Sequence, residues 1–266
     1  MKAMILAAGL GTRLRPITND RPKALVEISG RTLLEITLAR LRDFGIHDVI
    51  INVHHFAEKV LDYVTANKNF GMRIEFSRED VLLNTGGGLK KAAYFFLQDH
   101  TDEPFVLHNV DVISNIDLRE LLQLHREQKA LATLAVQKRK TSRYLLFDER
   151  LQLCGRQSGD DTGEFVRSST HCEGLGFCGV QIISPRIFSL MLEEGVFPLV
   201  PCYLRLAKRG ERIIAFPADQ YYWRDLGSVE HLAQAAREIQ QGVLAPETPP
   251  TSPQRRSTAA SPTDES

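Results

Sequence analysis

The chain has 266 residues, of which 43% are hydrophobic, so it is long enough to bury the core of one large α/β domain or of two small ones. Lysine and arginine together number 33, as do aspartate and glutamate, and the formal net charge is therefore zero. A chain without an overall positive field is a poor candidate for a nucleic-acid binder or for a protein held on an anionic membrane surface. Any basic site must be local.

The cysteines and the N-terminus bear on the cellular location. Cys154, Cys172, Cys178 and Cys202 have neither the Cys-x-x-Cys spacing of a zinc site nor the density of a disulfide scaffold. We therefore expect four reduced thiols. The apolar run after Lys2 is shorter than a signal-peptide core and no cleavage site follows it. The sequence thus predicts a cytoplasmic protein that is not exported.

Strand and helix patterns alternate in the first part of the chain, where apolar residues recur with helical spacing or gather in short runs rich in β-branched residues. The expected elements are a strand over 2–8, a helix over 32–42, a strand over 48–53, a helix over 57–66 and a strand over 73–76. Such alternation builds a largely parallel sheet with helices on both faces, and ligands bind such sheets outside the carboxyl ends of the strands.

The later part of the chain contains more strands. Strands are expected over 104–112, 130–137, 145–148, 151–155 and 174–185, and helices over 92–97, 118–128, 188–192, 200–208 and 229–239. Residues 245–266 hold five of the 12 prolines, many Ser and Thr, and no aromatic residue. This composition predicts a disordered tail.

A glycine-rich turn, Gly9–Gly11, follows the first strand. Glycine lets backbone N–H groups approach an anion closely, so phosphate is the expected guest. The dinucleotide fingerprint would need a third glycine where Leu14 stands, and the Gly-Lys-Ser/Thr of a Walker loop is absent. Arg13, Arg15 and Lys23 instead supply enough positive charge for a triphosphate or for two phosphorylated substrates. The alternative is a tight turn before a solvated basic segment.

Three further features fit a phosphate site. The cluster Gly86–Gly88 exposes backbone groups that can read a base or hold a ribose, or it serves as a hinge without a ligand. Asp111 ends an apolar strand, where an aspartate is most often a turn former but, next to phosphates, suits Mg²⁺. Asp225 comes just before Ser228, a natural N-cap for the last helix. The two acids meet only if the fold brings their strands together.

Five motifs occur in one order along the chain: Gly9–Pro16, Pro22–Val26, Thr85–Gly88, Asn109–Asp111 and Arg224–Ser228. In this order the chain resembles the sugar-1-phosphate nucleotidylyltransferases over roughly residues 1–240, and it is most similar to their short forms, the N-acetylmuramate-1-phosphate uridylyltransferase and mannose-1-phosphate guanylyltransferase types. The resemblance implies a Rossmann-like three-layer α/β sandwich with a mostly parallel central sheet. It also implies one domain over 1–244, with a nucleotide-binding part near 1–115 and a sugar-phosphate-binding part near 116–244.

The resemblance further implies transfer of a nucleoside monophosphate from a nucleoside triphosphate to a sugar 1-phosphate, with Mg²⁺ as cofactor. It assigns catalysis to Arg13, Lys23 and Asp111, and the metal to Asp111 and Asp225. The implied nucleotide contacts are Ala8, Gly9, Gly11, Thr12, Asn84, Gly87, Gly88 and Asn109. The implied sugar-phosphate contacts are Arg143, Glu173 and Gly179, although Glu173 also suits an exposed loop acid. Val110 stands where the family has glycine.

The base and the sugar stay open. UTP with an N-acetylmuramate or hexose 1-phosphate is the first expectation, and a GTP-dependent mannose- or heptose-1-phosphate guanylyltransferase is the alternative. A non-catalytic subunit that senses sugar nucleotides is the rival from another class, and a nicotinamide dehydrogenase is more distant because the third glycine is missing. We expect no nucleic-acid or membrane partner, while a homo-oligomer is compatible with the sequence.

Overall fold

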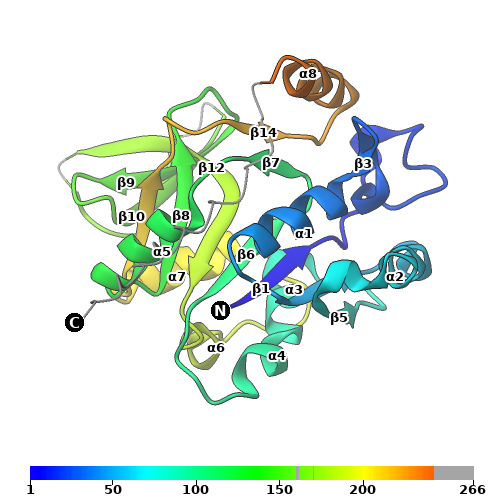
Figure 1. The fold of residues 1–266 in the computed structure, drawn as a ribbon. Helices are drawn as coiled ribbons and strands as arrows, with labels where there is room; N and C mark the ends of the chain where they lie inside the picture. Colours follow the sequence, from blue (N-terminus) through cyan, green and yellow to red (C-terminus); the bar gives the residue numbers. More distant parts are fainter. Residues whose placement is uncertain (160–161, 170, 243–266) are drawn as a thin grey trace, which may run out of the picture.

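The computed structural model describes residues 1–159, 162–169 and 171–242, so the tail predicted at 245–266 lies outside the described residues. A sheet of ten strands runs through the molecule, and helices cover both of its faces (Figure 1). The α/β class and the three-layer arrangement are therefore confirmed. None of the described helices is long and apolar enough to cross a membrane.

The first half of the sheet is parallel, as the strand–helix alternation predicts. Strand β1 (Lys2–Leu6) lies between β4 (Asp48–Val53) and β6 (Phe105–Asn109), and β5 (Arg73–Arg78) pairs with the far side of β4. All four strands are parallel, so their carboxyl ends lie at one edge of the sheet. The glycine turn that follows β1 and the segment that follows β6 therefore meet at that edge.

Alternate residues of the buried strands face two different cores, because successive side chains on a strand point to opposite faces. Ile5 of β1 packs in a cluster with α1 (Leu33–Asp43) and α2 (Ala57–Ala66), whereas Met4 belongs to the cluster on the other face. Helices α3 (Asn84–Lys91) and α4 (Ala93–Leu97), with α7 (Leu199–Lys208), cover that second face.

The second half of the sheet is antiparallel, which corrects the expectation of a mostly parallel sheet. The long strand β12 (Cys172–Ile183) runs antiparallel to β6, β8 (Ala132–Gln137) and β9 (Arg143–Asp148). Beyond it, β10 (Leu153–Ser158) and β11 (Glu164–Phe165) continue the antiparallel order, and β13 (Ile213–Pro217) runs parallel to β8.

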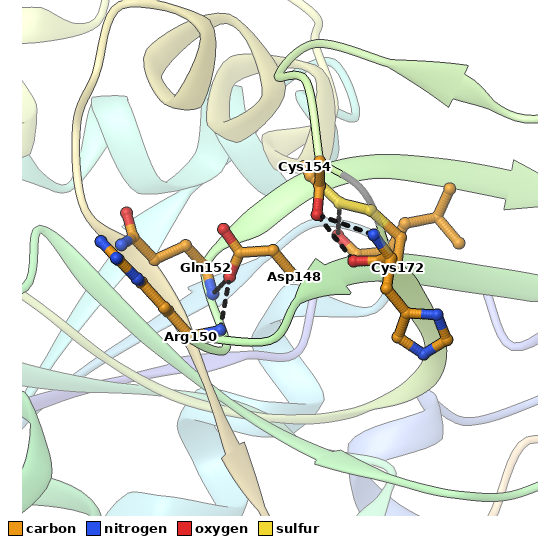
Figure 2. The surroundings of a disulfide bond; sticks show 8 residues. Asp148, Arg150, Gln152, Cys154 and Cys172 are labelled. Atoms are coloured by element: carbon orange, nitrogen blue, oxygen red, sulfur yellow. Dashed lines mark hydrogen bonds between the residues drawn. A yellow bond between two sulfur atoms is a disulfide. The ribbon is translucent and has the colours of Figure 1, made fainter.

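A short turn makes β9 and β10 antiparallel, because antiparallel strands need only a few connecting residues while parallel strands need a crossover. Between β9 and β10 the Asp148 carboxylate accepts hydrogen bonds from the backbone N–H groups of Arg150 and Gln152, at 3.0 and 2.8 Å (Figure 2). The turn is thereby fixed by its own side chain.

A small second sheet brings the C-terminal segment to the end of β6. Strand β7 (Val112–Ser114) pairs antiparallel with β14 (Trp223–Asp225), which places Asp225 opposite Val112. Ser228 then caps the last helix, as expected, by accepting a hydrogen bond from the His231 N–H group. The remaining elements are β2 (Glu27–Ile28), β3 (Arg31–Thr32), α5 (Leu118–Glu127), α6 (Ile187–Leu190), α8 (Val229–Gln240) and 3₁₀ helices at Thr12–Leu14, Lys23–Leu25 and Lys68–Gly71.

The cysteines differ from the expectation of four reduced thiols. Cys154 of β10 and Cys172 of β12 form a disulfide (Figure 2). The sequence spacing missed this pair because the two strands are brought together by β9, which pairs with both of them. Cys178 and Cys202 are free thiols, and burial raises the pKa of each to about 12.

Candidate active site

Two adjoining cavities lie at the carboxyl ends of β1 and β6. The smaller has a volume of about 340 Å³ and the larger about 1110 Å³. Their walls share five residues: Leu6, Arg13, Asn84, Thr85 and Asn109. Because Leu6 and Asn109 are the last residues of β1 and β6, the boundary between the cavities sits directly on the strand ends.

The glycine turn lines the smaller cavity through Ala8, Gly9, Gly11 and Thr12. Gly11 has φ +64°, and a Cβ atom there would lie 3.0 Å from the Thr18 side chain. The Thr18 hydroxyl donates a hydrogen bond of 2.8 Å to the Gly11 carbonyl oxygen. The turn therefore requires glycine at this position and is held in one conformation, with its backbone at the cavity wall.

Lys23 and Asp111 form an ion pair in the smaller cavity. The Lys23 Nζ donates to Asp111 Oδ2, and the side chains are 10% and 21% exposed. Lys23 opens a 3₁₀ helix after Pro22, whereas Asp111 follows β6, so the contact joins segments 88 residues apart. The ion pair places a positive charge and a carboxylate in the same cavity as the glycine turn.

Asp225 comes next to Asp111 through backbone pairing. The N–H group of Leu226 donates to the Asp111 carbonyl oxygen at 2.8 Å, one residue beyond the pairing of β14 with β7. Asp111 lines the smaller cavity and Asp225 the larger one. A late segment of the chain thus adds a second acid to the end of β6.

Gly227 allows Arg13 to reach this region. A Cβ atom on Gly227 would lie 2.4 Å from Arg13 Nη2 and 2.5 Å from Asp225 Oδ1. The Gly227 N–H group also donates to Asp225 Oδ1 at 2.6 Å, which fixes the orientation of the carboxylate. The Arg13 guanidinium therefore stands over Gly227, close to Asp225, at the boundary of the two cavities.

The donor set around Asp111 and Asp225 fits Mg²⁺. Residues 1–159, 162–169 and 171–242 contain no cluster of three or more His, Cys, Asp or Glu side chains that could enclose a metal ion. Mg²⁺ is usually held by one or two carboxylates, with phosphate oxygens and water as the remaining ligands. Asp111, which immediately precedes β7, and Asp225, on the paired strand β14, lie near the glycine turn and match that requirement.

The second glycine cluster is closely packed against the segment before α7. Residues 84–91 form helix α3, and the N–H groups of Gly86 and Gly87 both donate to the Phe197 carbonyl oxygen, at 3.0 and 3.1 Å. A Cβ atom on Gly87 would lie 2.3 Å from the Gly195 carbonyl oxygen, and one on Gly88 would lie 2.7 Å from Glu79 Oε1. Neither Gly87 nor Gly88 lines either of these two cavities, and both pack closely against neighbouring segments, so their contact with the nucleotide stays a prediction.

The start of α3 remains at the site. Asn84, in the left-handed conformation with φ +63°, and Thr85 line both cavities. The Thr85 hydroxyl accepts a hydrogen bond of 2.9 Å from the Leu199 N–H group, which ties α7 to this wall. The start of α3 thus forms part of the boundary between the cavities, and the contact of Asn84 with a nucleotide stays a prediction.

The sequence interpretation also missed a buried polar pair in the smaller cavity. Asn52, the next-to-last residue of β4, accepts a 2.7 Å bond from the Ala7 N–H group and donates a 2.7 Å bond to Glu79 Oε1. Glu79 is 4% exposed, and its Oε2 accepts from the Leu83 N–H group at 2.8 Å. A polar residue near the end of an apolar strand was the available signal, the same signal that singled out Asp111.

The larger cavity has a basic wall formed by the segment between β8 and β9 and by the first residue of β9. Arg143, expected at the sugar phosphate, lines this cavity together with Lys140 and Arg139. The Arg139 guanidinium lies 4.2 Å from the centre of the Trp223 ring and donates to the Phe177 carbonyl oxygen at 2.8 Å. Arg139 is thus held in place by its contacts, whereas Arg143 is exposed to the cavity and to solvent.

Two expected sugar contacts lie elsewhere. Glu173 pairs with Lys138 at 2.9 Å, and both side chains are exposed and outside the cavity walls. Gly179 has φ +72°, and a Cβ atom there would lie 2.8 Å from Asn109 Nδ2. The glycine therefore makes room for the Asn109 side chain, and its contact with a sugar ring stays a prediction.

An ion pair supports the far wall of the larger cavity. Arg224 bonds Glu238 of α8 at 2.5 and 3.0 Å and holds the pKa of that carboxyl near 2. Tyr222 also donates to Glu238, at 2.6 Å, and burial raises the pKa of the phenol. Helix α8 is thereby fastened to the segment that carries Asp225.

Comparison with known proteins identifies the class. Residues 2–145 match the family model described as "Nucleotidyl transferase". The UTP–glucose-1-phosphate uridylyltransferase of Synechocystis is 31% identical over 255 residues, which cover 90% of this chain but 63% of that protein. The N-acetylmuramate alpha-1-phosphate uridylyltransferase of Caulobacter vibrioides is 33% identical over 245 residues, which cover 88% of this chain and 96% of that protein.

The fold agrees with these sequence matches. The crystal structure of HddC from Yersinia pseudotuberculosis superposes with a TM-score of 0.70 at 22% identity, covering 90% of this chain and 99% of the other. The chain belongs to the nucleotidyl transferase family, that of the sugar-1-phosphate nucleotidylyltransferases.

Proposed function

We propose that the protein joins a nucleoside triphosphate to a sugar 1-phosphate, giving a nucleoside diphosphate sugar and pyrophosphate. One observation carries this proposal: the glycine turn with Arg13, the Lys23–Asp111 ion pair and Asp225 meet where a smaller and a larger cavity adjoin. Two substrates that react at their phosphates need two pockets that share one charged boundary.

The smaller cavity is the proposed nucleotide pocket. Its glycine turn, 9–12, provides backbone N–H groups for phosphate oxygens, and Ala8 precedes them on the same wall. Asn84 and Asn109 provide amide groups at the boundary. The Asn52–Glu79 pair supplies polar atoms on another part of the wall, suited to a base edge.

The larger cavity is the proposed sugar-phosphate pocket. Arg13 and Asn109 lie on its boundary with the nucleotide pocket, and Arg143 and Lys140 line it as well. No hydrogen bond or ion pair occupies the charged groups of Arg143 and Lys140 within the described part of the chain. They are therefore available for an anionic group of the sugar phosphate, and Arg143 keeps the role that the sequence suggested.

The reaction requires two anions to approach each other, so charge is the main barrier. An oxygen of the sugar phosphate attacks the α-phosphorus of the triphosphate, the bond to the β-phosphate oxygen breaks, and pyrophosphate leaves. The attacking oxygen is already ionised at neutral pH, so no general base is needed. Lys23 neutralises the reacting phosphates, and Arg13 with the 9–12 amides stabilises the negative charge that accumulates on the leaving pyrophosphate.

Asp111 and Asp225 are the residues that would hold Mg²⁺. When bound, the ion offsets phosphate charge and orients the two substrates. The chain itself contributes the position of the carboxylates: Lys23 orients Asp111, and the Gly227 N–H group orients Asp225.

For the substrates we propose UTP with an N-acetylmuramate or hexose 1-phosphate. The support is the Caulobacter relative, whose printed name states an N-acetylmuramate 1-phosphate uridylyltransferase and whose length this chain covers to 96%. Because the reaction consumes nucleoside triphosphates, we also propose a cytoplasmic location, and one domain over 1–244 with its nucleotide and sugar parts on either side of residue 115.

An assay of pyrophosphate release tests the proposal. The full chain is incubated with Mg²⁺, each of UTP, GTP and dTTP, and a panel of sugar 1-phosphates. Release that requires both substrates supports the transferase. Binding of sugar nucleotides without release under any combination would instead indicate a sensing subunit.

A further inference from the structure

Gln181 stands out in the larger cavity because it is polar, buried and incompletely paired. It lies on β12, is 3% exposed and lines the cavity wall. Its Oε1 accepts a 2.8 Å hydrogen bond from the hydroxyl of Tyr203, which is 1% exposed. Within the described residues, no group accepts a hydrogen bond from its Nε2.

Tyr203 fixes which end of the amide is available. Burial raises the pKa of this phenol well above its ordinary value, so the hydroxyl keeps its proton and donates it to Oε1. The Nε2 group is then left as the donor at the cavity wall. Because Gln181 lines the cavity, this donor is available to an acceptor on a ligand.

The surroundings of this donor are apolar. Leu134 pairs with Gln181 across the β8–β12 ladder, and Leu199 lies one helical turn before Tyr203 on α7. Leu134, Leu199 and Val200 all line the same cavity. A ring hydroxyl both donates and accepts and gains little from such a wall. A group with one carbonyl oxygen and an alkyl carbon suits this wall better, because the oxygen accepts from the Gln181 Nε2 donor and the alkyl carbon packs on the apolar side chains.

From this juxtaposition we infer that the larger cavity takes a sugar 1-phosphate bearing an acylamino group, with the carbonyl oxygen accepting from Gln181 Nε2 and the alkyl group packing on Leu134 and Leu199. The inference rests on the proposed function and narrows its substrate class. It makes Gln181 a specificity-determining residue and Tyr203 the residue that positions it.

The test compares matched sugars in the pyrophosphate-release assay. N-acetylglucosamine 1-phosphate is compared with glucose 1-phosphate, and N-acetylmuramate 1-phosphate with its de-N-acetylated counterpart, using the triphosphate that gives the fastest turnover. We expect kcat/KM to be about tenfold higher for the acetylated member of a pair, the effect of one well-placed hydrogen bond and its apolar contact.

Gln181→Glu tests the residue itself. The carboxylate still accepts from Tyr203 but cannot donate, so the ratio of kcat/KM values between acetylated and non-acetylated sugars should fall about tenfold, mainly through KM. The matched control is Gln98→Glu, the same change at an exposed site on the end of α4. If Gln181→Glu does not fold, Gln181→Met removes the donor without adding charge.

The outcomes separate the two proposals. Equal kcat/KM values within both sugar pairs, or a preference that persists in a folded Gln181 variant, would overturn the acylamino site and leave the transferase assignment intact. Absence of pyrophosphate release with every sugar and every triphosphate would reject the transferase assignment, and the acylamino site would fall with it.

Discussion

Replacing Lys23 with methionine removes one charge from the proposed reaction centre while keeping most of the side-chain volume. Lys23 is 10% exposed, and its only ion pair within the described residues is with Asp111. Loss of one preorganised charge beside a reacting phosphate lowers kcat by about 10²–10³, which corresponds to roughly 3–4 kcal/mol of transition-state stabilisation. We expect that loss in pyrophosphate release at saturating substrates.

A matched control separates charge at the site from charge in general. Lys138→Met breaks the ion pair between Lys138, which is 65% exposed, and Glu173, which is 46% exposed. Such exposed pairs contribute about 0–1 kcal/mol to the free energy of unfolding. Lys138→Met should keep wild-type turnover. The role given to Lys23 would be refuted by a Lys23→Met protein that has the same melting temperature as the wild type and retains more than a tenth of its kcat.

Three further predictions concern the other acid, the glycine helix and the buried histidines. Asp225→Asn should raise the Mg²⁺ concentration for half-maximal activity at least tenfold in titrations of turnover, and an unchanged titration would remove Asp225 as a ligand. Gly87→Ala should lower the free energy of unfolding in urea by about 1–3 kcal/mol, because its Cβ would lie 2.3 Å from a carbonyl oxygen. The control Gly45→Ala has open space around its Cβ but φ +77°, so it should lower that free energy by about 1 kcal/mol through backbone strain alone. Burial lowers the pKa of His108 and His125 to about 4. Between about pH 6.5 and 4 the unfolded chain therefore binds more protons than the folded one, so the free energy of unfolding should decrease as the pH falls. At pH 5 the loss should be roughly 1–2 kcal/mol per histidine, and the total loss should be smaller in His125→Gln. A free energy of unfolding that does not change with pH in the wild type would contradict the burial argument.

The sequence was informative about the glycine turn because local rules determine its conformation. A short apolar strand followed by Gly9–Gly11 implies a strand end, and parallel strands present such ends at one edge. Asp111 could be placed at the same edge by the same reasoning. The approach of Asp225 depends on the pairing of β14 with β7, a contact between segments more than 100 residues apart that no local pattern specifies.

The glycines show why the rest was not predictable. A missing Cβ serves either a ligand or a neighbouring backbone, and the sequence does not distinguish the two. Gly11 lies at the cavity, whereas Gly87 admits the Gly195 carbonyl oxygen and Gly179 admits Asn109. Similarly, the 18-residue separation of Cys154 and Cys172 matches no cysteine motif that would predict their pairing. Their contact follows from the order of the strands, because β9 lies between β10 and β12.

The most direct test of the central claim follows phosphorus through the reaction. ³¹P NMR of the full chain with Mg²⁺, a nucleoside triphosphate and its preferred sugar 1-phosphate should show pyrophosphate and a nucleoside diphosphate sugar appearing in equal amounts, and neither without both substrates. Formation of a nucleoside monophosphate or diphosphate without sugar transfer, or no change in any phosphorus signal across the substrate panel, would contradict a cleft in which the two cavities share one reaction centre.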